Sequence, residues 1–212
     1  MDKTQTEFRV ACVDVGIKKS DLKALFSFLA PLRDKNAITH VHYLHSLRVG
    51  LLSRKIAKFT LRDERALLMA GALHDLGKCQ VCIKTLGKTD GWTKKDSREM
   101  ERHVADGFRT LRGRFDFSAD TMVRHHSFQD NGYPKKLPKF LHDYSPVTRE
   151  LIIEHARIVA LADVYDALHR VNDKFGQKRA LGGIEIKALM FEFNSDKAEL
   201  ISRLYEAEIL KE

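Results

Sequence analysis

Apolar residues recur at helical spacing along most of this chain. From residue 20 onward the hydrophobic positions follow the i, i+3, i+4 period of amphipathic helices, with polar residues between them. We find no convincing strand pattern after residue 20, so the sequence predicts an all-α helical bundle. Pro31 is expected to interrupt or kink the first helix. The expected helices begin at residues 20 and 39 and then cover 62–76, 94–112, 118–126, 146–170, 183–193 and 196–210.

The start of the chain is less regular. Phe8 to Val15 is rich in β-branched residues, which favours a short strand or an extended arm. Ser20 and the apolar residues after it predict a helix. We therefore expect an N-terminal arm or helix over residues 1–35 and the main domain over residues 36–212.

Two stretches rich in turn-forming residues interrupt the helical pattern. Residues 79–92 contain Gly87 and Gly91 and are expected to form a loop. Residues 128–146 contain Asn131-Gly-Tyr-Pro134 and two further prolines. They predict a long loop, and loops of this length are often functional.

Composition narrows the class of protein. No apolar run approaches the roughly 20 residues needed to span a bilayer, which argues against an integral membrane protein. The N-terminus lacks the basic-then-apolar signature of a secretory signal, and an odd number of cysteines, three, suits a reducing cytoplasm. The net charge of +8 indicates anionic ligands such as nucleotides, nucleic acid or an acidic partner. A solvated basic surface would have the same charge.

Potential metal ligands lie in several of the predicted helices. His74 and Asp75 are adjacent at the end of the helix predicted over residues 62–76. A carboxylate can bridge two cations, whereas an imidazole nitrogen binds one, so such a pair at a buried helix end suits a two-metal site. Gly77 is expected to end that helix in a left-handed cap. A lone histidine is more often a surface or core residue than a ligand. The ordered set across consecutive helices exceeds what one tetrahedral site needs: His45, His74, Asp75, His103, His125, His126 and Asp163.

This order of residues resembles the HD superfamily of metal-dependent phosphohydrolases. The motif reads His, His-Asp-x-Gly-Lys, His, His-His and Asp, and the resemblance covers roughly residues 36–210. Asp130-Asn-Gly-Tyr-Pro134 and Ala162-Asp-Val-Tyr-Asp-Ala-Leu168 are similar to segments of its HD-GYP branch, the cyclic di-GMP phosphodiesterases. The resemblance implies an HD-domain helical bundle with a metal centre in its core.

The resemblance also implies a role for each matching residue. It implies two divalent metal ions, of iron, manganese, nickel or zinc, and Val41 replaces the glutamate that adds a third in some members. Lys78 matches the family lysine beside the bridging solvent and the scissile phosphate, so Asp75 and Lys78 are the expected catalytic residues. The first metal would be held by His45, His74, Asp75 and Asp163, and the second by Asp75, His103, His125 and His126.

The substrate-reading residues depart from the family pattern. Ser127 replaces a glutamate after the double histidine, and the loop that follows is one residue short. The Arg-Pro-Tyr-like motif that helps hold the phosphates is absent or rebuilt in residues 170–176, with Arg170, Lys174 or Lys178 as candidate substitutes. Tyr133 could stack on a base or a partner, or pack under its loop.

Three functions fit these observations. The leading interpretation is a phosphodiesterase that hydrolyses a cyclic dinucleotide such as cyclic di-GMP by a water activated between two metals. The alternatives are an HD-type nuclease or nucleotide phosphohydrolase, favoured by the basic charge, and a catalytically silent sensor of nucleotides. The Gly-Tyr-Pro loop is a candidate contact for a signalling partner, and the oligomeric state is open.

Other polar residues carry less specific signals. Asp166 shares a helical face with Asp163 and could orient a metal ligand, although a surface carboxylate fits equally. The Cys79-x-x-Cys82 pair is better explained as two loop cysteines. The histidines without a matching motif position are expected to be surface or structural: His40, His42, His142, His155 and His169.

Overall fold

The computed structural model describes residues 2–129, 131–170 and 179–212, and within these ranges it contains helices and loops and no strand. This confirms the all-α prediction. The elements are α1 (Lys3–Asp14), α2 (Lys19–Asp34), α3 (Ala37–Phe59), α4 (Glu64–Leu73), the 3₁₀ helix η1 (Leu76–Gln80), α5 (Ile83–Leu86), α6 (Lys94–Leu111), α7 (Asp116–Met122), α8 (Pro146–Leu168), α9 (Gly183–Phe193), the 3₁₀ helix η2 (Ser195–Lys197) and α10 (Ala198–Glu206).

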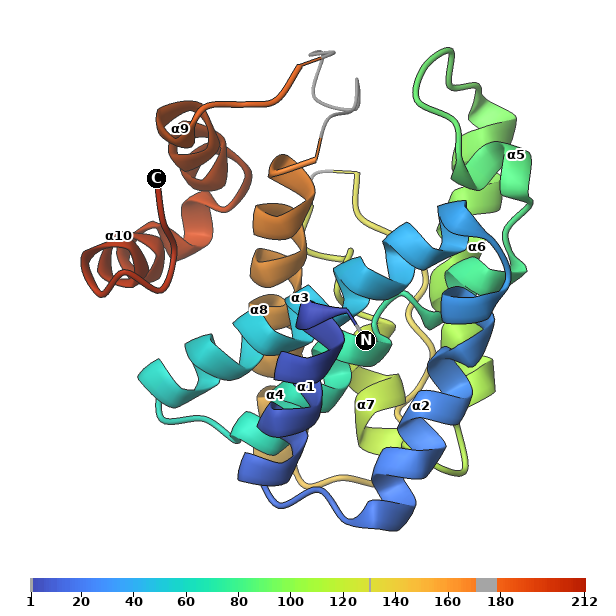
Figure 1. The fold of residues 1–212 in the computed structure, drawn as a ribbon. Coiled ribbons are helices and arrows are strands. Elements are labelled where there is room, and N and C mark those ends of the chain that lie inside the picture. Colours follow the sequence, from blue (N-terminus) through green and yellow to red (C-terminus); the bar gives the residue numbers. More distant parts are fainter. Residues whose placement is uncertain (1, 130, 171–178) are drawn as a thin grey trace.

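The α3–α4 pair forms the centre of the bundle (Figure 1). Asn36 and Thr39 form a reciprocal capping box that begins α3. The two helices approach closely because glycines lie where they meet. A Cβ atom on Gly71 would lie 2.8 Å from the Cα of Gly50, and one on Gly50 would lie 2.8 Å from the carbonyl oxygen of Leu68.

Two hydrophobic clusters flank this pair. Cluster 1 joins one side of α3 and α4 to α1, α2, α6 and α7, through residues such as Phe8, Leu47 and Met122. Cluster 2 joins α3 and α4 to α8, α9 and α10, through residues such as Ile56 and Leu161. In Figure 1, α9 and α10 lie on the opposite side of the molecule from α5 and α6.

The N-terminal segment differs from the sequence prediction. The stretch from Phe8 to Val15 is neither a strand nor an extended arm, because residues 3–14 form α1. Asp2 caps this helix, and Phe8, Ala11 and Cys12 bury one helical face in cluster 1. This tertiary burial outweighs the weak β preference of the valines. Whether residues 1–35 form a separate unit stays a prediction.

Several helix boundaries also differ from their predictions. α2 continues through Pro31 to Asp34 rather than ending at the proline. α7 begins after Phe115, so Ser118 lies inside this helix and does not cap it. The stretch predicted as a loop after Cys79 includes the end of η1 and the short helix α5. Among the helices of the described ranges, none combines the length and the apolar character that crossing a bilayer requires.

Candidate metal centre

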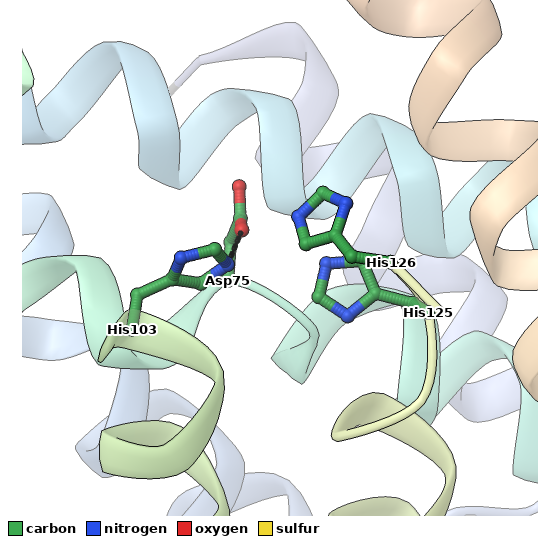
Figure 2. A group of neighbouring side chains, drawn as sticks. All are labelled: Asp75, His103, His125 and His126. Atoms are coloured by element: carbon green, nitrogen blue, oxygen red, sulfur yellow. Dashed lines mark ion pairs between the residues drawn. The ribbon is translucent and has the colours of Figure 1, made fainter. Parts of the chain in front are cut away.

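The predicted ligands lie together in the structure as two buried groups. The first ligand group consists of His45 from α3, His74 at the end of α4 and Asp163 from α8. The second ligand group consists of Asp75, which precedes η1, His103 from α6, and His125 and His126 from the turn after α7. Within each group the ligand atoms lie within 4.8 Å of one another. In Figure 2 the imidazole of His103 faces those of His125 and His126, with the Asp75 carboxylate beside them.

Asp75 contacts both groups through different oxygen atoms. Its Oδ2 lies 3.4 Å from Nε2 of His45 and 3.3 Å from Nε2 of His74. Its Oδ1 lies 3.1 Å from Nε2 of His103. Nε2 of His45 also lies 3.0 Å from Oδ1 of Asp163. One carboxylate therefore presents one oxygen to each group, as a bridging ligand would.

The donor atoms of the histidines fit metal binding. Nδ1 donates a hydrogen bond to the carbonyl oxygen three residues earlier in His74 (2.7 Å), His103 (2.6 Å) and His125 (2.5 Å). Nε2 of each ring is buried and, among the described residues, has no hydrogen-bond partner. Because a carbonyl oxygen only accepts, Nδ1 carries the proton and a neutral ring leaves the Nε2 lone pair free. Metal-binding histidines show this arrangement.

Burial and neighbouring charges shift the pKa values of the site residues in opposite directions. Burial raises the pKa of Asp75, but His74, Lys78 and other neighbours bring it well below its usual range. Burial lowers the pKa of His74, yet Asp75 and Asp163 raise it to about 10. Burial and the charge of His74 lower the pKa of His125 to about 3. Divalent ions would replace the proton on His74 as the charge that compensates these carboxylates.

Local backbone packing brings the second ligand group together. η1 crosses α6 at two glycines, Gly77 and Gly107. A Cβ atom on Gly77 would lie 1.9 Å from the carbonyl oxygen of His103 and 2.6 Å from the nitrogen of Gly107. The left-handed cap predicted for Gly77 is wrong, since this residue lies within η1 and is absent from the positive-φ residues. Glycine is needed here for close approach rather than for an unusual dihedral angle.

Lys78 and Tyr133 lie against the ligand groups. Nζ of Lys78 is 2.5 Å from Oδ2 of Asp75. The Tyr133 ring packs against His126, with centroids 4.4 Å apart, and edge-on to His103 at 6.0 Å. The backbone N–H of Tyr133 donates to the carbonyl oxygen of His126. The contacts of Tyr133 match the packing alternative, and its contact with a base or a partner stays a prediction.

The residues predicted to read the substrate are only partly described. Lys174 and Lys178 lie outside the described residues. Arg170 is described and half-buried. Burial lowers the pKa of His42 to about 2, and the positive charges of Lys78 and Arg170 contribute to this shift. His42 lies on α3, about one helical turn before His45, and is half-buried. Its role, expected to be surface or structural, stays a prediction.

A further pair of side chains supports the first ligand group. Asp166 accepts a hydrogen bond from Nδ1 of His45 at 2.6 Å, so it is not a free surface carboxylate. Arg48, which no sequence motif indicated, bonds both oxygens of Asp166. His155 is fully buried, which fits its structural interpretation. In the sequence, His155 lies at helical spacing from apolar residues of α8, which is a signal for burial. The contact of Arg48 has no such signal, because it depends on how α3 and α8 pack.

The comparison with protein families identifies this architecture. The family model described as "HD domain" matches residues 43–168, a range that includes every ligand of both groups. The chain belongs to the HD domain family. The match confirms the predicted fold.

Characterised relatives of this HD domain come from several bacteria. The chain is 34% identical over 136 residues to the cyclic di-GMP phosphodiesterase response regulator RpfG of Xanthomonas campestris pv. campestris, covering 62% of this chain and 31% of that protein. It is 30% identical over 176 residues to a cyclic di-GMP phosphodiesterase of Thermotoga maritima, covering 79% of this chain and 43% of that protein. It is 29% identical over 132 residues to the 3'3'-cGAMP-specific phosphodiesterase 1 of Vibrio cholerae, covering 59% of this chain and 28% of that protein. The alignments thus span less than half of each relative, and they support the HD-GYP-like resemblance.

Proposed function

We propose that this HD domain is a metal-dependent phosphodiesterase that hydrolyses a cyclic dinucleotide, cyclic di-GMP or a related molecule. The observation that carries the proposal is the pair of buried ligand groups with Asp75 between them and Nε2 atoms aimed inward. The relatives named as cyclic dinucleotide phosphodiesterases indicate the substrate class. The residues proposed to hold two divalent ions are those of the first and second ligand groups, with Asp75 shared.

The protein's own residues have distinct tasks in this proposal. Ions bound to the two groups would supply Lewis-acid stabilisation of phosphoryl oxygen charge and an activated water. Lys78, held against Asp75, adds positive charge at the position where an anionic phosphodiester would bind. Arg170 and His42 are the described residues proposed to face the rest of the substrate, and Lys174 remains a candidate by sequence. A cytoplasmic location, expected from the cysteines, belongs to the same proposal.

A hydrolysis assay with matched variants tests the proposal. The protein is purified without oxygen, loaded with Mn²⁺ or Fe²⁺, and given cyclic di-GMP, 3'3'-cGAMP, linear dinucleotides, mononucleotides and single-stranded oligonucleotides. We expect cyclic dinucleotide cleavage that falls by at least about 100-fold in Asp75→Asn. Asp143→Asn is the control, because its side chain is 99% exposed, and circular dichroism checks the fold of both variants.

The same panel distinguishes the alternatives. Asp75-dependent cleavage of oligonucleotides or mononucleotides alone would assign the chain to the nucleases or nucleotide phosphohydrolases, which its charge of +8 would suit. A protein that retains no metal after anaerobic purification and cleaves nothing would favour the silent sensor. Binding of a signalling partner to the loop over residues 128–146 stays a separate prediction.

A further inference from the structure

Arg48 and Asp166 form a two-helix ion pair beside the first ligand group. Nε of Arg48 donates to Oδ1 of Asp166 at 2.6 Å, and its Nη2 donates to Oδ2 at 3.0 Å. Oδ2 also accepts from Nδ1 of His45 at 2.6 Å. Arg48 lies on α3, three residues after His45, whereas Asp166 lies on α8, three residues after Asp163. The pair therefore joins α3 and α8, two of the three helices that contribute ligands to this group.

His45 is held differently from the other ligand histidines with a bonded Nδ1. In His74, His103 and His125 the acceptor is a backbone carbonyl three residues earlier, which the local chain fixes. For His45 the acceptor is a side chain 121 residues away. A carboxylate can rotate about its χ2 angle, which is a broad torsion. The orientation of His45 thus depends on what fixes Asp166.

We propose that Arg48 is a positioning residue that acts through Asp166 to orient His45 for metal binding. This inference rests on the proposed function of the first ligand group. A guanidinium that bonds both carboxylate oxygens sets the carboxylate plane, which a single donor would not do. Oδ2 is then directed at Nδ1 of His45, and Nε2 of His45 at Asp75 and Asp163. The gradient of side-chain exposure, 40% for Arg48, 11% for Asp166 and 0% for His45, places Arg48 outermost in this series.

A Co²⁺ titration of the metal-free protein tests this role, with visible absorption as the readout. We expect two binding steps in the wild type. In Arg48→Gln one step should weaken by about 10–100-fold, as when outer partners of metal-bound histidines are lost. The other step should stay within about twofold. Arg48→Lys should recover part of the loss, because lysine keeps the charge but cannot form the paired bonds.

A double-mutant comparison separates positioning from general stability. If Arg48 acts through Asp166, then Arg48→Gln combined with Asp166→Asn should bind Co²⁺ no more weakly than Asp166→Asn alone. Arg54→Gln is the matched control, since Arg54 also lies on α3 and pairs with a carboxylate, Glu64 on α4. It should leave both binding steps unchanged. Urea unfolding of each metal-free variant verifies that the chain is folded.

Distinct results would overturn the two proposals. Equal Co²⁺ affinities for wild type, Arg48→Gln and Arg48→Lys, or additive effects of Arg48→Gln and Asp166→Asn, would overturn the role of Arg48 while leaving the metal site intact. A wild-type protein that binds no Co²⁺ would overturn the metal centre itself, and the role of Arg48 with it. Normal metal binding without hydrolysis would count against the proposed function alone.

Discussion

The two ligand groups use the same residue types but are supported in different ways. In the first group His45 and Asp163 lie within long helices, and the Arg48–Asp166 pair holds Nδ1 of His45. In the second group Asp75, His125 and His126 lie at element ends and turns, and His103 lies within α6. Backbone carbonyls hold His103 and His125, and the Gly77 crossing brings Asp75 beside α6. The first group thus has one histidine, His45, held by a tertiary ion pair, whereas the bonded histidines of the second group are held by backbone carbonyls, as His74 also is. Different substitutions should therefore disable them.

Gly77→Ala should have the largest effect and should act on the second group. The new methyl group would overlap the carbonyl oxygen of His103, so η1 and α6 must separate and Asp75 must move away from His103. We expect more than about 100-fold weaker metal binding at that group and a free energy of unfolding lower by about 2–3 kcal/mol. Co²⁺ titration and urea denaturation measure these effects.

Gly87→Ala is the control for this substitution. A Cβ atom there would meet the Cδ1 atom of Ile38, the end of a flexible side chain, at 2.7 Å. We expect this variant to retain both Co²⁺ binding steps. Two intact steps in Gly77→Ala would mean that the crossing does not position Asp75.

Removal of the Tyr133 ring should produce a moderate effect on the same group. The ring covers His126 and His103, so Tyr133→Ala should weaken metal binding at the second group by about 10-fold and spare the first. Tyr133→Phe should resemble the wild type, because packing rather than the hydroxyl makes these contacts. Tyr144→Ala, on the same loop, is the control. A raised KM with unchanged metal affinity in Tyr133→Ala would instead support contact with a base.

His155 offers the smallest effect and tests a buried contact between α7 and α8. It is buried on α8 and stacks edge-on against Phe117 of α7, with centroids 5.6 Å apart. Burial lowers its pKa below the ordinary value of 6.5. The unfolded chain therefore takes up a proton near pH 6.5 that the folded chain does not. The stability that a neutral His155 contributes is present above that pH and is lost as the pH falls.

The measurement compares His155→Leu with the wild type. The free energy of unfolding is measured in urea with EDTA from pH 8 to pH 5. Below pH 6.5 the wild type should lose stability relative to His155→Leu, by at most about 1.4 kcal/mol for each pH unit. His142→Leu, at a side chain 57% exposed, is the control. A pH-independent difference for His155→Leu would mean that His155 titrates alike in both states.

The residues of the centre could be predicted from sequence because their spacing follows the helices that hold them. His74 and Asp75 end one apolar run, and Asp163 lies within another. The contact of Arg48 with Asp166 could not be predicted, because it depends on how α3 packs against α8, which helical periodicity does not encode. The α1 helix was missed for a related reason, since burial of Phe8 and Cys12 outweighs the local preference of their valine neighbours.

The division of the core has a consequence for cooperativity. His103 and His125 neighbour Val104 and Val123 of cluster 1, whereas Asp163 lies between residues of cluster 2. The ligand groups beside these residues consist of imidazoles and carboxylates, which need protons or ions to balance the negative charge of the carboxylates. Coordination would turn these groups into cross-links, in the way that a disulfide joins distant segments of chain. An ion bound to the first group, whose ligands come from α3, α4 and α8, would then couple the unfolding of the two sides of the core.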